Sequence, residues 1–409
     1  MIKINRYKYV FALLFVSVVA IILSGGKVQA ASLTVNSLAD TTVQDDGECT
    51  FREAILNVNA GSDTTDGGSG GDCIAGDGNS DTITIPSGTI NLSAGLPPVT
   101  QPAAIIGQGI GQTIINGGSG QYPVIINSTN LSIKRLTVTG FKDYGIYSQD
   151  NSIVIDQVEV DGSNSIFQTG PNSGAYGVVI VNRSTSIVDV NVSNLYVHDM
   201  TSTSTNLFPL LISTGRDTPG STGDLHATVS NVTIANISGD GNVFALLAAA
   251  GMNSFGYGTG ATYLDASNIT VSGIHSNAGP ASGIIIAAIT PENRQTTAIL
   301  KNITVTNISG LPNPLFGGKS GAGIIALTGG FVDGVSNVVN LDVQNALIAD
   351  TGNACGAADA SGVLGSNATG IHNFVSLGGN LTDDNSCVPY FTQSTDQNNV
   401  AALAASLLP

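Results

Sequence analysis

The feature that most constrains the fold of this chain is a six-residue motif that recurs along the sequence. Each copy has a polar residue, an aliphatic, a polar, a second aliphatic, one variable residue, and finally Gly, Asn or Asp. Successive copies begin 22, 37, 37, 37, 34 and 38 residues apart. A recurring unit of this size predicts a solenoid, in which each repeat contacts only its neighbours. The copies begin at Arg135, Gln157, Asn194, Asn231, Asn268, Asn302 and Asn340.

The alternation within the motif indicates a β-strand with one buried face, because alternate side chains point to the same side. Gly, Asn and Asp tolerate a left-handed backbone, so we expect a sharp turn at the sixth position. The leading asparagines are either solvated turn residues or a ladder of amides stacked about 4.8 Å apart, and we favour the ladder. Its predicted members are Asn194, Asn231, Asn268, Asn302 and Asn340.

Two other apolar segments keep the same period, for example Ile284-Ile285-Ile286 and Ala227-Thr228-Val229. Three short strands per coil describe an all-β protein, a parallel β-helix, and the general rule for parallel crossovers makes it right-handed. Only 10% of the residues are charged and the mean hydropathy is +0.24, which excludes a disordered chain. In such a solenoid one interior file should contain Val197, Ile234, Val271 and Val305.

Residues 1–30 have the pattern of a signal peptide. Basic residues precede an apolar run, Tyr9 to Leu23, and Val28-Gln29-Ala30 provides a cleavage site. Fifteen apolar residues are short for a membrane span, which needs about 20, although an uncleaved segment would act as an anchor. The remaining chain has nine basic residues against 29 acidic ones, a net charge of −20, so nucleic acid is not an expected partner.

The four cysteines form two local pairs at opposite ends of the chain: Cys49 with Cys73, and Cys355 with Cys387. An even number in an exported protein predicts disulfides. Four cysteines allow three connectivities, and a solenoid leaves only the local one because its ends lie far apart. Each bridge would stabilise an end of the solenoid by about 3–4 kcal/mol.

Residues 31–126 are expected to form an N-terminal cap and irregular first coils. Thr50 to Ala60 has helical spacing, and such a helix can cover the open first coil. The run Asp45 to Ile55 (DDGECTFREAI), followed by Asn59 and by 81–86 (DTITIP), resembles the CSLREA domain of exported bacterial β-helix proteins, with Thr-Phe in place of the usual Ser-Leu. The resemblance implies a secreted or surface location and no established catalytic residues. We interpret Arg52 and Glu53 as a buried or capping ion pair.

Asp77, Asn79 and Asp81 space oxygen ligands like the first half of a calcium loop. The glycine and the final acid of such a loop are missing, so a solvated loop held by the disulfide is the preferred interpretation. We expect no other cofactor. The regular body should span residues 127–350. Residues 351–409 should form a C-terminal cap with a helix from Asp396 to Leu408, and an ending without a sorting motif is consistent with truncation.

Outward positions of the motif stack in two rows, and these rows contain the candidate catalytic residues. Glu159 should lie beside Tyr196, and Asp161 beside His198, which is a possible acid/base site. The alternative is an exposed polar patch, which we favour because Asn-Thr-Asp and Gly-His-Gly motifs are absent. The complete rows are Thr137, Glu159, Tyr196, Thr233, Thr270, Thr304, Asp342 and Thr139, Asp161, His198, Ala235, Ser272, Thr306, Gln344.

The sequence therefore predicts a noncatalytic, secreted or cell-surface β-helix, and without Trp it offers no indole platforms for a deep polysaccharide cleft. Its expected role is adhesion or binding to cell-surface glycans or to other surface proteins, as a monomer. Membrane association would need an uncleaved signal or a missing C-terminal anchor. The alternative is a carbohydrate-active enzyme, a polysaccharide lyase or glycoside hydrolase on a pectin-lyase-like fold.

Overall fold

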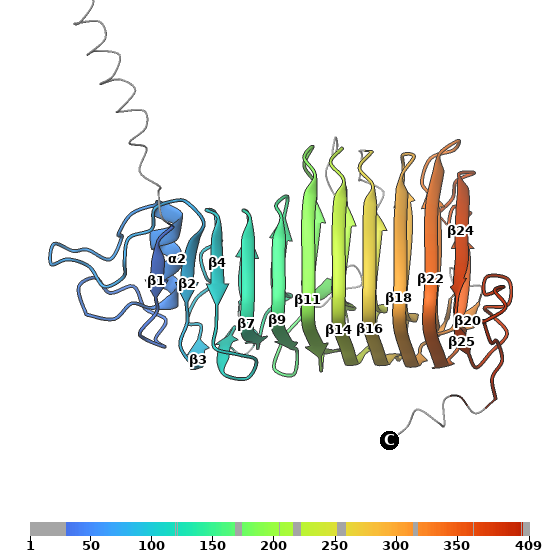
Figure 1. Ribbon diagram of the computed structural model, residues 1–409, viewed down its shortest axis with the longest axis horizontal. Coiled ribbons are helices and arrows are strands. Elements are labelled where there is room, and N and C mark those ends of the chain that lie inside the picture. The colour runs from blue at the N-terminus through green and yellow to red at the C-terminus, as the bar shows by residue number, and fades with distance from the viewer. Residues whose placement is uncertain are drawn as a thin grey trace, which may run out of the picture.

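The protein is a parallel β-helix whose coils stack along one long axis (Figure 1). The computed structural model describes residues 30–118, 120, 122–167, 174–203, 205–215, 222–251, 259–313, 318–362, 364–401 and 403. Neighbouring coils pair in parallel throughout the two large sheets, so segments one repeat apart in sequence lie side by side. The predicted fold class is confirmed.

Among the described residues, the larger sheet has 15 strands and contains the recurring motif. Its main path follows chain order from β1 to β24, with short strands attached beside it. The strands are β1 (Ser32–Thr34), β2 (Asp81–Thr84), β3 (Gly88–Asn91), β4 (Ala103–Ile106), β5 (Thr113–Asn116), β7 (Leu131–Thr139), β9 (Ile153–Asp161), β11 (Val188–His198), β12 (Thr201–Ser202), β14 (Leu225–Gly239), β16 (Thr262–Ser276), β18 (Gln295–Ser309), β22 (Ser336–Thr351), β24 (Thr369–Gly378) and β25 (Leu381–Thr382).

The smaller sheet has eight strands in the described part of the chain and contains the second apolar segment of each coil. Its strands are β6 (Ile125–Asn127), β8 (Tyr144–Gln149), β10 (Gly174–Asn182), β13 (Asn206–Thr214), β15 (Val243–Ala250), β17 (Ala281–Thr290), β21 (Ala322–Gly330) and β23 (Cys355–Asp359). A separate antiparallel pair joins β19 (Pro312–Asn313) and β20 (Lys319–Ser320).

From β7 to β22, each long strand of the larger sheet contains two of the three strands predicted per coil, joined at one residue in the left-handed conformation. In β14 this residue is Asn231, with φ of 54°. The turn predicted at the sixth position is left-handed as well, as at Asn236 with φ of 57°, but not at Gly162. The sequence did not predict the left-handed leading position, which also occurs at Arg135, Gln157, Asn194, Asn268, Asn302 and Asn345.

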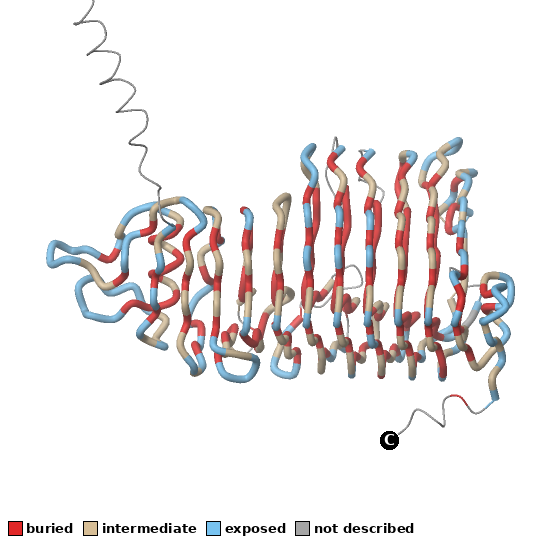
Figure 2. Tube along the Cα trace, viewed as in Figure 1, coloured by how far each residue is buried: buried red, intermediate tan, exposed pale blue. Residues whose placement is uncertain are grey.

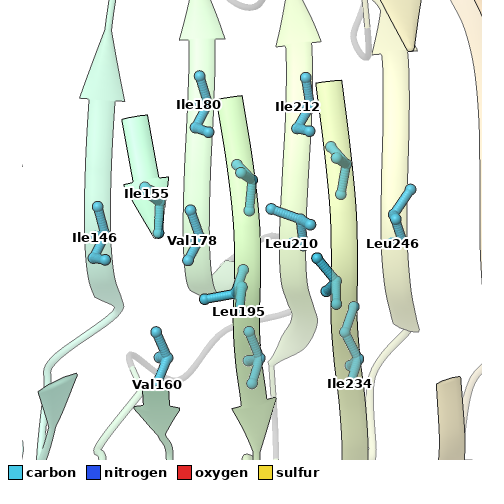
Figure 3. Packing of buried hydrophobic residues seen from close by; sticks show 14 of the residues in the cluster. Ile146, Ile155, Val160, Val178, Ile180, Leu195, Leu210, Ile212, Ile234 and Leu246 are labelled. Atoms are coloured by element: carbon cyan, nitrogen blue, oxygen red, sulfur yellow. The ribbon is translucent and has the colours of Figure 1, made fainter. Parts of the chain in front are cut away.

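The interior between the sheets is filled by files of aliphatic side chains, one residue per coil. Val197, Ile234, Val271 and Val305 pair in succession and are fully buried, as predicted. Figure 2 shows buried positions alternating with more exposed ones along the long strands. In Figure 3, side chains from both sheets point into the shared space between them. Burying each such side chain contributes about 1.5–3 kcal/mol, which only stacked coils can achieve.

The last copy of the motif is out of register with its prediction. Asn302 lies beside Asn345, and its neighbour Ile303 pairs with Ala346. Asn340 instead pairs with Thr297, and its side chain accepts a hydrogen bond from Asn373 at 2.7 Å. Position 340 therefore belongs to another file, and the ladder runs through Asn194, Asn231, Asn268, Asn302 and Asn345, with side-chain hydrogen bonds of 3.0–3.2 Å.

The N-terminal cap contains the one helix among the described elements, α2 (Phe51–Ala60), at the end of the stack (Figure 1). Thr50 and Glu53 form a capping box, which satisfies two backbone donors of the first turn. Glu53 is buried and caps the helix, as predicted, but its partner is Thr50 and not Arg52. Arg52 instead makes a two-pronged contact with Asp40, whose two N–O distances are both 2.8 Å.

Both predicted disulfides are formed, Cys49–Cys73 beside the helix and Cys355–Cys387 at the other end. Strands β23, β24 and β25 continue the stack beyond residue 350 by one more coil. The predicted helix from Asp396 to Leu408 is wrong in its first part, since Gln397 forms a parallel bridge with Leu381. Residues 402 and 404–409 lie outside the described residues, as do residues 1–29 of the predicted signal peptide.

Candidate functional site

The four candidate catalytic residues meet where β9 and β11 pair. Tyr196 lies opposite Glu159, and His198 lies opposite Asp161, as the predicted stacking requires. Their outward rows do not continue into β22 as predicted, because the neighbours of Thr304 and Thr306 are Leu347 and Ala349. The two predicted last members, Asp342 and Gln344, pair with Ile299 and Lys301 instead.

His198 is held on three sides. Its Nε2 lies 3.2 Å from Glu159 Oε1, and its Nδ1 lies 2.8 Å from Asp199 Oδ2. The ring stacks on Tyr196 with centroids 4.0 Å apart and planes 19° from parallel. Asp199 reaches the imidazole because the left-handed turn at its own backbone, φ of 54°, directs the chain out of the strand. The imidazole is therefore fixed in one orientation between two carboxylates.

The carboxylates have further hydrogen bonds, two to the neighbouring coil and one to the turn that follows Asp161. Glu159 Oε2 accepts from the Thr137 hydroxyl at 2.7 Å. Asp161 accepts from the Thr139 hydroxyl at 3.3 Å and from the Ser163 backbone N–H at 2.9 Å. These contacts hold both side chains in place, and they use acceptor positions that a general base needs free for its substrate.

Tyr196 is kept in its protonated form. Burial of the phenol raises its pKa, and the negative charges of Asp199, Glu159 and Asp161 raise it further. At neutral pH the hydroxyl can therefore donate a hydrogen bond, but it cannot act as a proton acceptor in the way that a lyase base must.

A polar groove begins at Asp199 and runs along the axis over successive coils. It has a volume of about 460 Å³. Thr201 pairs with Ser238, Ser238 with His275, and His275 with Ser309, so a row of hydroxyl and imidazole side chains follows the groove. The sequence analysis missed this row, although extending the motif by two residues beyond its turn would have found it. The groove is lined by Ser163, Asp199, Thr201, Asn236, Ser238, Gly273, His275 and Asn307.

The three candidate calcium ligands lie in the N-terminal cap, far along the chain from this groove. Asp81 is buried and accepts hydrogen bonds from the backbone N–H groups of Ala31, at 3.0 Å, and of Asp77, at 3.2 Å. The amide of Asn79 donates to the carbonyl of Asp77 at 3.1 Å. Burial raises the pKa of Asp81, with Asp77 close by. This arrangement connects the cap to the first coil, and a calcium site here stays a prediction.

Arg294, between β17 and β18, was not singled out by the sequence. It is 3% exposed, and within the described residues its three guanidinium nitrogens have no hydrogen-bond partner. Burial lowers its pKa, and the negative charge of Glu292 opposes this only in part. A buried guanidinium without hydrogen-bond partners costs free energy, so this side chain destabilises the body.

Comparison with known proteins does not identify a family. No protein-family model matches the sequence, and no curated protein or solved structure is detectably similar to it. The arguments about function therefore depend on the geometry of this chain.

Proposed function

We propose that this protein is a noncatalytic β-helix of the cell surface or the secreted fraction, which binds neutral glycans along its polar groove. The observation that carries the proposal is the groove itself, in which four consecutive coils present hydroxyl, amide and imidazole groups at a spacing of about 4.8 Å. Sugar hydroxyls both donate and accept hydrogen bonds, and so do these side chains. Repeated weak subsites give a long polymer avidity that a short one lacks.

Charge and redox chemistry support the same role. The chain has a net charge of −16, and Asp199 lines the groove, so acidic polysaccharides would be repelled. Two disulfides indicate an oxidising environment such as the cell exterior. In the described portion of the chain, no helix is both long and apolar enough to cross a membrane. The predicted signal peptide and the resemblance to the CSLREA domain belong with this proposal.

A carbohydrate-active enzyme is the second candidate, and one observation favours it. Asp199 belongs both to the groove and to the group of acids around His198, so a bound sugar chain would reach a carboxylate and an imidazole. The internal hydrogen bonds of Glu159 and Asp161 and the protonated Tyr196 are the reasons to place it second.

Affinity electrophoresis with neutral and acidic polysaccharides tests the first proposal. We expect a neutral polymer to retard the protein. The affinity for that polymer should fall at least tenfold in Ser238→Arg, because the arginine side chain fills the middle of the groove. Thr228→Arg is the matched control, because this exposed residue lies on the same strand before the bend at Asn231. Equal binding by the two variants would contradict the groove as the binding site.

A turnover assay on the same polysaccharides separates the two candidates. We expect no release of reducing ends or of unsaturated products by the wild-type chain. Turnover that is lost in both Asp161→Asn and His198→Ala would instead establish the enzyme.

A further inference from the structure

Three ligand-bearing side chains come together beside the groove in a way that sugar binding does not explain. Asp161, His198 and Asp199 each offer one ligand atom, and these atoms lie within 4.8 Å of one another. Ligands of a bound Zn²⁺ lie about 2.1 Å from the ion, so adjacent ones are roughly 3–3.5 Å apart. Small side-chain rotations would bring the three atoms to that spacing.

The imidazole is already oriented as a metal ligand would be. Glu159 contacts Nε2 at 3.2 Å and is itself held by the Thr137 hydroxyl at 2.7 Å. A carboxylate behind the ring is the usual partner of a ligating histidine. It accepts a hydrogen bond from the N–H of one ring nitrogen, which leaves the other nitrogen unprotonated and able to bind a metal. The free nitrogen here is Nδ1, which faces Asp199.

The contact between Nδ1 and Asp199 needs a cation. If Nε2–H donates to Glu159, both Nδ1 and Asp199 Oδ2 are acceptors, yet they lie 2.8 Å apart. Either a proton or a metal ion must therefore lie between them. Three carboxylates surround one imidazole, and none of them forms an ion pair with Lys or Arg among the described residues, so a divalent ion would also balance the local charge.

We propose that Asp161, His198 and Asp199 bind a divalent first-row transition ion, with Glu159 orienting the imidazole from behind. The nitrogen ligand favours ions such as Zn²⁺ over Ca²⁺ and Mg²⁺, which prefer oxygen alone. The side chain of Asp199 is 45% exposed and lines the groove, so the remaining coordination positions face water or a bound hydroxyl group.

Isothermal titration of the purified chain with ZnCl₂, CaCl₂ and MgCl₂ tests the site. We expect one Zn²⁺ per chain, with affinity lowered at least tenfold by Asp199→Asn and by His198→Ala. His226→Ala is the matched control, because His226 lies 3.9 Å from Asp189 in an exposed pair outside the cluster. Zinc binding that is unchanged by Asp199→Asn, or that is lost in His226→Ala, would overturn the proposal.

Two further measurements guard against variants that fail to fold. Glu159→Gln keeps the shape of the side chain and should weaken zinc binding by about 10–100-fold. Co²⁺ added to the wild-type chain should produce visible absorption bands that His226→Ala retains and Glu159→Gln weakens. Preference for Ca²⁺ over Zn²⁺, or absence of cobalt bands, would show that the imidazole is not a ligand.

Discussion

Asn231 has two roles at the bend of its coil. Its backbone is left-handed, and its side chain donates to Asn194 at 3.2 Å and accepts from Asn268 at 3.0 Å. The ladder ends on the carboxylate of Asp156, which accepts from Asn194 at 2.8 Å and whose pKa is lowered, chiefly by that hydrogen bond. The ladder lies on the outside of the protein, so the two interpretations of these asparagines are compatible: they are exposed and hydrogen-bonded to each other.

Two substitutions at this position separate conformation from hydrogen bonding. Asn231→Gly keeps the left-handed backbone and loses two neutral hydrogen bonds, so we expect the free energy of unfolding to fall by about 1–2 kcal/mol. Asn231→Ala should lose about 1 kcal/mol more, because a Cβ is strained there. Urea unfolding of both variants is the measurement. A glycine variant less stable than the alanine variant would contradict the double role.

At Arg294 we expect a substitution to raise the free energy of unfolding rather than lower it. Since its buried guanidinium has no hydrogen-bond partner in the described part of the chain, Arg294→Met should raise the free energy of unfolding by about 1–4 kcal/mol. Thermal unfolding measures it, with Arg294→Lys as a control that keeps the buried charge. A destabilised methionine variant together with a wild-type-like lysine variant would show that the charge is needed.

At the scale of elements, β22 shows where sequence reasoning failed and why. This strand contains Asn340-Leu341-Asp342-Val343 and, five residues later, Asn345-Ala346-Leu347-Ile348. Only the first alternates apolar and polar residues, whereas Ala346-Leu347-Ile348 is an unbroken apolar run, so hydrophobic alternation alone selects the wrong segment. The choice depends on backbone conformation, since Asn345 has φ of 53° and stacks on Asn302, whereas Asn340 lies inside the extended part of the strand.

The helix α2 shows that local sequence patterns predict a helix but not the partners of its charged side chains. The sequence predicts the helix through its apolar spacing, which is a local property. It does not predict that Arg52 contacts Asp40, because that contact depends on how the loop before the helix folds back. Arg52 also donates to the carbonyls of Ala94 and Gly95, at 2.6 and 2.7 Å, and so joins the cap to the first coils.

The Asp40–Arg52 pair makes the cap sensitive to acid. Burial opposes ionisation of Asp40, but hydrogen bonds from Arg52 and Ser93 outweigh it and hold its pKa below the usual value. A lowered folded-state pKa stabilises the protein above the unfolded value of about 3.9, and this contribution is lost as pH falls through the folded value. Asp40→Asn should therefore be less stable than wild type at pH 7, and the difference should shrink below about pH 4.

Urea midpoints of wild type and Asp40→Asn between pH 2 and pH 7 test this prediction. Asp189→Asn is a suitable control, because that side chain is 77% exposed. A difference between wild type and Asp40→Asn that stays constant over the whole range would contradict the assignment.

For the whole molecule, repetition is what made the fold predictable. Equivalent positions of successive coils occupy equivalent places in the fold, so a single alignment of the repeats predicted several features. These are the meeting of Asp161 with His198, the two local disulfides and the interior row Val197, Ile234, Val271 and Val305. The polar groove and the buried Arg294 did not follow, because they depend on the turns and loops between strands, where the period varies.

Disulfide trapping between adjacent coils tests the central claim, the stacking of residues one repeat apart, most directly. Thr233 pairs with Thr270, and directly paired parallel strands place their Cα atoms about 4.8 Å apart, within reach of a disulfide. The account predicts that Thr233→Cys with Thr270→Cys oxidises to a new intrachain disulfide seen by peptide mass mapping. Thr233→Cys with Ser272→Cys, two residues out of register, should stay reduced. A new disulfide in the second variant and none in the first would contradict the account.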